Sequence, residues 1–246
     1  MINIIPSIYV SAGKSVGIKQ GDFKQIKVYS DSPLDVAKAY RDGGIRRIEL
    51  IDLEGTKSNS PVTFDILKDI VTQTGLKVNY GGGIKSRDSI RNAQDNGADK
   101  IICSTIAATQ PNVFSYWLEC FGSETMIFGA DLKGEKLAVR GRKREVETPL
   151  DELIRSYLLE GVKFVEVADI ERSGMMTGPA IEFYTSLSGR YPRITVIAKG
   201  GVRNMEDIIA LQEKKIYNVV VGTAIAEGNI TMKDIEDFYG RKNDTE

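Results

Sequence analysis

Short runs of apolar and β-branched residues recur along the chain at fairly even intervals. Eight such runs are present, at residues 4–10, 46–52, 76–81, 99–104, 125–131, 163–169, 193–199 and 217–222. Most of them are almost continuously apolar rather than alternating, which is typical of parallel strands that are buried on both faces. The pattern therefore predicts eight strands of a parallel sheet.

Segments with helical spacing lie between these runs. Examples are residues 32–44, 63–75, 86–97, 148–161 and 204–215. The alternation of strands and helices indicates right-handed βαβ units, and eight such units in a chain of 246 residues match the size of a closed (β/α)8 barrel. A doubly wound open sheet is the alternative. Because no low-complexity linker divides the chain, we expect a single barrel domain over residues 1–246.

The composition excludes several functional classes. Lysine and arginine number 33 against 34 acidic residues, so the net charge of −1 provides no basic field for nucleic acid or a membrane surface. No apolar run approaches the roughly 18 residues of a membrane span, and the first residues lack the features of a signal peptide, so we expect a cytoplasmic protein. The two cysteines suggest neither a disulfide framework nor a metal cluster. Histidine is absent, so acid–base chemistry must use Asp, Glu, Lys, Tyr or groups of the ligand.

One segment of the chain occurs twice. Residues 81–108 align without a gap on residues 199–226, at an offset of 118 residues (199 − 81) that is close to half the chain. The alignment places Gly82 on Gly200, Gly83 on Gly201 and Thr105 on Thr223. Each half of the chain is therefore expected to form four strands of the barrel.

Both copies of this segment end a strand in two glycines and then begin a helix. Glycine lets a ligand approach the backbone N–H groups closely, and the N-terminus of the following helix adds unpaired N–H donors. We predict two phosphate sites at the carboxyl ends of the strands, where the active sites of barrels lie, and a long ligand with a phosphate at each end. The alternative is that these glycines serve only to form turns.

Motifs along essentially the whole chain resemble those of one family. They are IIPSI (4–8), QGDF (20–23), IDLEGTK (51–57), GGGIKS (81–86), FGADLK (128–133), ADIERSGMMTGP (168–179), KGGV (199–202) and VVGTAI (220–225). The chain resembles the phosphoribosylformimino-aminoimidazole carboxamide ribotide isomerases of histidine biosynthesis. The resemblance implies a barrel that binds a small phosphosugar with two phosphates and rearranges an aminoaldose to an aminoketose. That reaction needs an acid and a base but no cofactor and no metal. We expect a monomer that binds neither nucleic acid nor membrane.

The phosphate-binding positions of the family are retained. The resemblance assigns Gly82, Gly83, Ser104 and Thr105 to one site, and Gly174, Gly200, Gly201, Gly222 and Thr223 to the other.

Positions that carry the chemistry of the family differ in this chain. Tyr9 and Ser173 stand where the family has its two key aspartates. An unperturbed tyrosine, with a pKa of about 10, is a poor base at neutral pH, and serine without an activating partner is no better. We therefore expect the isomerisation to be weak or absent. The alternatives are an active isomerase with substitute groups, an enzyme with a different reaction, and a non-catalytic regulatory paralogue.

Other changes lie near the expected site. Gly17 replaces an arginine of the first loop, and Gly141 and Arg142 replace the Gly-Trp of the fifth loop. That loop carries the basic run 140–145, which either adds charge around a phosphate or is solvated.

Four side chains are candidates for a catalytic role, namely Tyr9, Asp131, Asp169 and Lys199. Lys199, in place of a serine of the family, is expected to bind an anion, form a Schiff base or form an ion pair with Asp169 or Asp131. The two aspartates are expected either to share a proton, which would raise one pKa, or to bind loop N–H groups.

Overall fold

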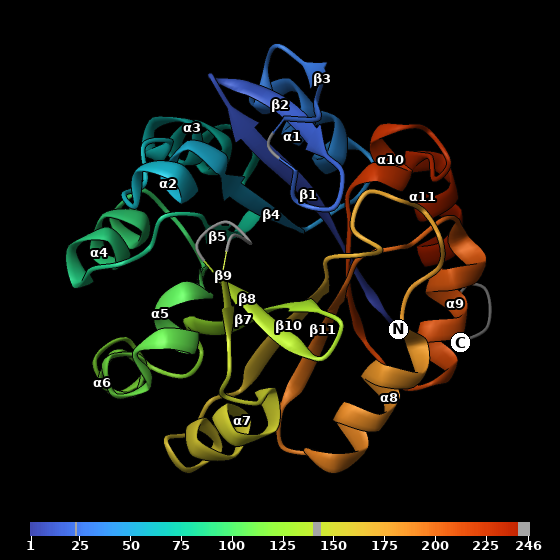
Figure 1. Cartoon of the computed structure of the whole chain (residues 1–246). Helices are drawn as coiled ribbons and strands as arrows, with labels where there is room; N and C mark the ends of the chain where they lie inside the picture. The colour runs from blue at the N-terminus through green and yellow to red at the C-terminus, as the bar shows by residue number, and fades with distance from the viewer. Residues whose placement is uncertain (23, 140–143, 241–246) are drawn as a thin grey trace.

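Eight parallel strands close into a barrel in the computed structural model, which describes residues 1–22, 24–139 and 144–240 (Figure 1). The strands are β1 (Asn3–Ser11), β4 (Arg47–Asp52), β5 (Lys77–Gly81), β6 (Lys100–Cys103), β7 (Met126–Lys133), β10 (Phe164–Asp169), β11 (Thr195–Lys199) and β12 (Asn218–Val221). They pair in the order β10-β11-β12-β1-β4-β5-β6-β7, and β10 also pairs with β7, which closes the ring. The expected (β/α)8 barrel is therefore confirmed, and the open sheet is excluded.

Helices surround the strands in Figure 1. They are α1 (Pro33–Asp42), α2 (Leu53–Ser58), α3 (Phe64–Thr74), α4 (Arg87–Asp95), α5 (Thr105–Thr109), α6 (Pro111–Phe121), α7 (Leu150–Leu159), α8 (Ile181–Arg190), α9 (Met205–Glu213), α10 (Thr223–Ala226) and α11 (Met232–Gly240). The side chains of Ser32, Ser86 and Asn204 cap α1, α4 and α9 by accepting a backbone hydrogen bond. In the part of the chain that the structure describes, no helix is long and apolar enough to cross a membrane.

Two antiparallel hairpins were not foreseen from the apolar pattern. One consists of β2 (Lys14–Ile18) and β3 (Ile26–Ser30) after β1, and the other of β8 (Lys136–Val139) and β9 (Arg144–Val146) after β7. The outer strands β3 and β9 are largely exposed. Their sequences therefore lack the continuous apolar run that marks a buried strand.

The near-continuous apolar strands bury one face against the helices and the other inside the barrel. The barrel interior contains a cluster of small and branched side chains, namely Ile5, Ile102, Ile127, Ile197 and Val220. The other interior positions include charged residues, and these define the site described next.

Candidate functional site

Two cavities are lined by the ends of the barrel strands and the loops that follow them. The first cavity is lined by Gly82, Gly83, Ser104 and Thr105. The second is lined by Gly174, Gly200, Gly201, Gly222 and Thr223. The structure thus brings each set of expected phosphate-binding residues together, and the two copies of the repeated segment line separate cavities.

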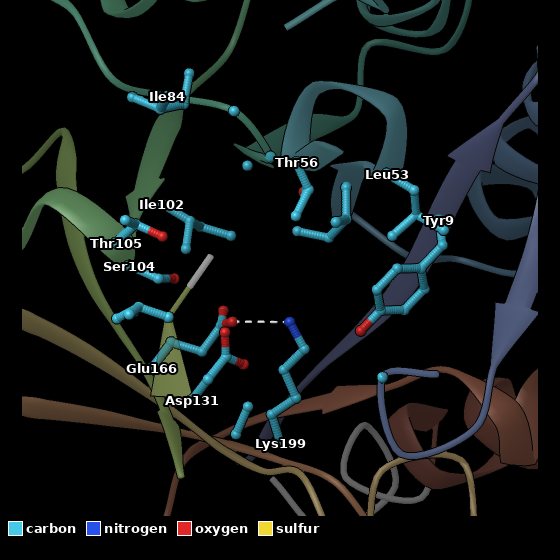
Figure 2. A pocket seen from close by; sticks show the side chains of 18 of the residues that line it. Tyr9, Leu53, Thr56, Ile84, Ile102, Ser104, Thr105, Asp131, Glu166 and Lys199 are labelled. Carbon is cyan, nitrogen blue, oxygen red and sulfur yellow. Dashed lines mark hydrogen bonds and ion pairs between the residues drawn. The ribbon is translucent and has the colours of Figure 1, made fainter. Parts of the chain in front are cut away.

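The two cavities share part of their wall. Tyr9, Ile18 and Lys199 line both of them. Figure 2 shows the first cavity, with Ser104 and Thr105 on one side and Tyr9 on the other, and with Lys199 and Glu166 extending between them. A ligand that reached both glycine turns would therefore pass Tyr9 and Lys199.

The glycine turns are required by close contacts within the protein. Gly82 and Gly200 have φ angles of +102° and +106°, where L side chains are strained. A Cβ atom would lie 2.2 Å from the carbonyl oxygen of Asp52 at Gly82, and 2.7 Å from that of Asp169 at Gly200. The same contact thus recurs in both halves of the barrel. These contacts require glycine at both turns independently of any ligand.

Alanine at Gly82 is expected to destabilise the protein by about 2–5 kcal/mol, from the strain of a positive φ and the displacement of the Asp52 backbone. Gly75 is a matched control, because it lies in the left-handed region with φ +69° and ψ 9°, and a Cβ there would contact nothing within 4 Å. Gly75→Ala is expected to cost only about 1–2 kcal/mol. Chemical denaturation measures both values, and equal losses would contradict the contact at Gly82.

Asp52, at the end of β4, has a structural role. Its Oδ1 accepts a hydrogen bond from the Gly55 N–H at 2.6 Å, which caps α2. Its Oδ2 accepts from the N–H groups of Val62 at 2.6 Å and Thr63 at 3.0 Å. These bonds hold the loop against which Gly82 packs.

Asp169 also binds its own loop. Its carboxylate accepts a hydrogen bond from the Arg172 N–H at 3.1 Å and forms an ion pair with the Arg172 side chain at 3.0 Å. It is not among the residues that line either cavity. Asp131 lines the first cavity beside Glu166 and Lys199 (Figure 2). The loop-binding alternative therefore holds for Asp169.

Lys199 forms two buried ion pairs inside the barrel. Its Nζ lies 2.6 Å from Glu49 Oε1 and 2.9 Å from Glu166 Oε1. Because β4 lies three positions from β11 in the strand order, the contact with Glu49 crosses the barrel interior. The predicted ion pair of Lys199 with Asp169 is wrong, because the Asp169 carboxylate pairs with Arg172 instead.

The charges of this cluster shift two pKa values. Burial by itself would lower the pKa of Lys199, but Glu166 and Glu49, with smaller effects of Tyr9 and Asp131, raise it well above its usual value. Burial and the charge of Glu166 raise the pKa of Glu49 well above its usual range, against the opposite effect of Lys199. Lys199 is therefore a stable ammonium ion, which makes it a poor nucleophile for a Schiff base.

Glu49 and Glu166 were not predicted from the sequence as residues of the site. Both are almost fully buried, with 0% and 3% of their surface exposed. The available signal was an acidic residue inside an apolar run, in RIELID (47–52) and in FVEVAD (164–169). Buried acidic side chains are rare unless they are paired with a cation. Lys199 is that cation in the structure.

Two further changes noted in the sequence lie near the second cavity or the fifth loop. A Cβ at Gly17 would lie 2.5 Å from the Tyr29 ring, so Tyr29 fills the space beside this position. The Tyr29 hydroxyl donates to Glu227 at 2.8 Å and accepts from Thr223.

Residues 140–143, which hold Gly141, Arg142 and most of the basic run, lie outside the described residues. Ser173 is buried and lines the second cavity.

The fold and these cavities define a (β/α)8 barrel whose candidate ligand site lies at the carboxyl ends of its strands. A model of the family described as "Histidine biosynthesis protein" matches residues 3–231. The chain belongs to this family.

Similar proteins carry the name 1-(5-phosphoribosyl)-5-((5-phosphoribosylamino)methylideneamino) imidazole-4-carboxamide isomerase. The one from Bacteroides thetaiotaomicron is 40% identical over 238 residues, which cover 97% of this chain and 100% of the relative. The one from Flavobacterium johnsoniae is 37% identical over 237 residues, which cover 96% of this chain and 99% of the relative. The family expected from the sequence motifs is therefore confirmed.

Proposed function

We propose that the chain binds a small phosphosugar with two phosphates, one at each glycine turn. The observation that carries this proposal is the pair of equivalent turns, each lining its own cavity, with Tyr9 and Lys199 on the wall that the cavities share. The names of the relatives specify a substrate with two phosphoribosyl groups. We call this compound the bis-phosphoribosyl substrate.

The chemistry of the relatives is proposed to be weak in this chain. The family aspartate of the first strand is replaced by Tyr9, whose ring lies 5.8 Å from the Lys199 ammonium. The raised pKa of Lys199 keeps its amine protonated, and tyrosine is a poor base at neutral pH. Neither side chain on the shared wall therefore provides a strong base. We propose that the chain holds the bis-phosphoribosyl substrate but isomerises it slowly.

An active isomerase with substitute groups is the second candidate. The observation that favours it is the presence of Asp131 and Glu166 in the lining of the first cavity, because carboxyl groups serve as general acids and bases. A non-catalytic regulatory paralogue, by contrast, would bind the substrate without any turnover.

Removal of a hydroxyl from each proposed phosphate site tests the binding. Thr105→Val and Thr223→Val are each expected to weaken binding of the bis-phosphoribosyl substrate about 10- to 100-fold, the effect of one hydrogen bond to a charged group of about 1.5–3 kcal/mol. Isothermal titration calorimetry measures the affinity and the number of ligands per chain.

The matched control for this test is Thr109→Val. The Thr109 hydroxyl donates to the Thr105 carbonyl, and Thr109 lines neither cavity. This control is expected to bind within about threefold of the unaltered chain, which is about 0.7 kcal/mol. Unchanged affinity in both threonine variants would overturn the proposal.

A further inference from the structure

The Tyr29 side chain reaches from the outer hairpin strand β3 into the second cavity. It lines that cavity together with Gly200, Gly201 and Thr223, which are expected to bind the second phosphate. Its ring lies against Gly17 of β2, where a Cβ atom would lie 2.5 Å from the ring carbon Cε2 and 2.8 Å from the hydroxyl oxygen. The motif resemblance predicts an arginine of the family at this position. Glycine here therefore leaves the space that the Tyr29 ring fills in this chain.

Hydrogen bonds connect the Tyr29 hydroxyl to the second glycine turn and to a carboxylate. The hydroxyl accepts from Thr223, which directly follows Gly222, and donates to Glu227 Oε1 at 2.8 Å. The Lys27 Nζ atom lies 2.8 Å from both carboxylate oxygens of Glu227. A chain of contacts therefore runs from the expected phosphate-binding residue Thr223 through Tyr29 to an ion pair.

The groups in this chain of contacts have definite protonation states at neutral pH. Burial and the hydrogen bond to Glu227 raise the pKa of Tyr29 above its usual value, so the hydroxyl keeps its proton. Hydrogen bonds from Lys27 and Tyr29 lower the pKa of Glu227, which is therefore a carboxylate. The Tyr29 hydroxyl has one proton to donate, and an anion accepts it in the free chain.

The cations beside the two glycine turns are used differently. Lys85 lines the first cavity, so its ammonium group can contribute positive charge there. Arg203 aligns with Lys85 in the repeated segment, but its guanidinium group donates to both carboxylate oxygens of Asp207, at 3.0 Å and 2.6 Å. Arg203 is also not among the residues that line the second cavity. A phosphate at the second turn therefore has to find its side-chain donors elsewhere in the chain.

We propose that the Tyr29 hydroxyl binds the second phosphate and that the Glu227 carboxylate competes with this phosphate for the same donor. This proposal rests on the proposed function. In the free chain the Tyr29 O–H group donates to Glu227 and the Thr223 O–H group donates to Tyr29. A phosphate at the second turn offers acceptor oxygens to both hydroxyls. Both then turn to the phosphate, and Glu227 stays paired with Lys27.

The competition makes the two phosphate sites unequal. Binding at the second turn breaks the hydrogen bond between Tyr29 and Glu227 and brings a second anion close to the Glu227 carboxylate. The repulsion between these anions opposes binding, and the Lys27 ammonium offsets it only in part. The affinity of the second site therefore depends on the charge of Glu227 and on the ionic strength.

Replacement of Tyr29 by phenylalanine tests the binding role of the hydroxyl. Tyr29→Phe keeps the ring beside Gly17 and is expected to weaken binding of the bis-phosphoribosyl substrate about tenfold or more, the effect of one hydrogen bond to a charged group. Isothermal titration calorimetry on the full chain measures the affinity. Tyr217→Phe is the control, because Tyr217 is 49% exposed and lines neither cavity. It is expected to bind within about threefold of the unaltered chain.

Replacement of Glu227 by glutamine tests the competition, because loss of a purely structural residue would not raise the affinity. Glu227→Gln removes the negative charge but keeps an oxygen that can accept from Tyr29. The variant is expected to bind the substrate about two- to fivefold more tightly at low salt, the effect of one charge near the surface. The gain is expected to disappear in about 1 M salt, where the Debye length is about 3 Å. Glu213→Gln, exposed at the end of α9, is the control and is expected to change nothing.

Gly17→Ala tests the placement of the Tyr29 ring while leaving its hydroxyl in the chain. The added Cβ atom displaces the ring, so this variant is expected to weaken binding as Tyr29→Phe does, and the double variant is expected to lose no more than either single one. Full affinity of Tyr29→Phe, additive losses in the double variant, or no gain in Glu227→Gln would each overturn this inference. Failure of the unaltered chain to bind the substrate would instead overturn the proposed function.

Discussion

Replacement of Lys199 by methionine is expected to lower the free energy of unfolding by about 3–5 kcal/mol at pH 7, because it leaves buried carboxyl groups without their cation. The Lys199 Nζ atom lies 2.6 Å from Glu49 Oε1 and 2.9 Å from Glu166 Oε1. Methionine retains most of the side-chain volume, so the loss reports charge rather than packing. Chemical denaturation measures the difference.

The pH dependence of this loss gives a second check. The folded-state pKa of Lys199 is raised, so its contribution is fully present below the unfolded-state pKa of about 10.4 and is lost as the pH rises through the folded-state value. Burial and Glu166 raise the pKa of Glu49, and the variant lacks the opposing charge of Lys199. The carboxyl groups of the variant therefore take up protons well above their usual range, and the difference between Lys199→Met and the unaltered chain is expected to shrink as the pH falls.

Lys163→Met is the matched control for this experiment. Lys163 pairs with Glu124 at the surface, where its side chain is 53% exposed, and such pairs contribute about 0–1 kcal/mol. If both lysine variants lose the same small amount, the cluster does not behave as a buried ion-paired unit.

The isomerisation rate with the bis-phosphoribosyl substrate is expected to be about 10²- to 10⁴-fold lower than that of the Bacteroides thetaiotaomicron relative, the usual effect of losing a positioned acid–base group. Tyr9 lines both cavities and Ser173 lines the second, and the motif resemblance predicts aspartates at these two positions in the family. Tyr9→Asp combined with Ser173→Asp is expected to recover at least about tenfold of the rate, or about 1.4 kcal/mol of the barrier.

Steady-state assays of the relative, this chain and the double variant measure these rates under one set of conditions. The control is Tyr9→Phe, which removes the hydroxyl but adds no carboxylate and is expected to leave the low rate unchanged. A rate for the unaltered chain within tenfold of the relative would favour the active isomerase with substitute groups.

The sequence predicted the barrel because its eight inner strands are buried on both faces and therefore appear as apolar runs. The glycines of residues 81–108 and 199–226 revealed the internal repeat. Gly82 packs against the Asp52 backbone and Gly200 packs against the Asp169 backbone in the same way, which explains why both copies have glycine there. The hairpins β2–β3 and β8–β9 were missed because their outer strands, β3 and β9, are largely exposed and carry no such run.

The charged interior of the site was harder to predict from the sequence. Lys199 was recognised as unusual, but its partners were assigned to aspartates at neighbouring strand ends. The actual partner Glu49 lies on a strand across the barrel. Which strands face each other across a closed barrel depends on the strand order and register, and single-sequence patterns do not specify these contacts.

A crystal structure of the chain soaked with the bis-phosphoribosyl substrate tests the central claim most directly. The account requires one ligand per chain, with one phosphorus atom beside Gly82 and Gly83, the other beside Gly200 and Gly201, and the sugar passing Tyr9 and Lys199. Density for a phosphate at only one turn, or for a ligand that leaves both turns empty, would contradict it.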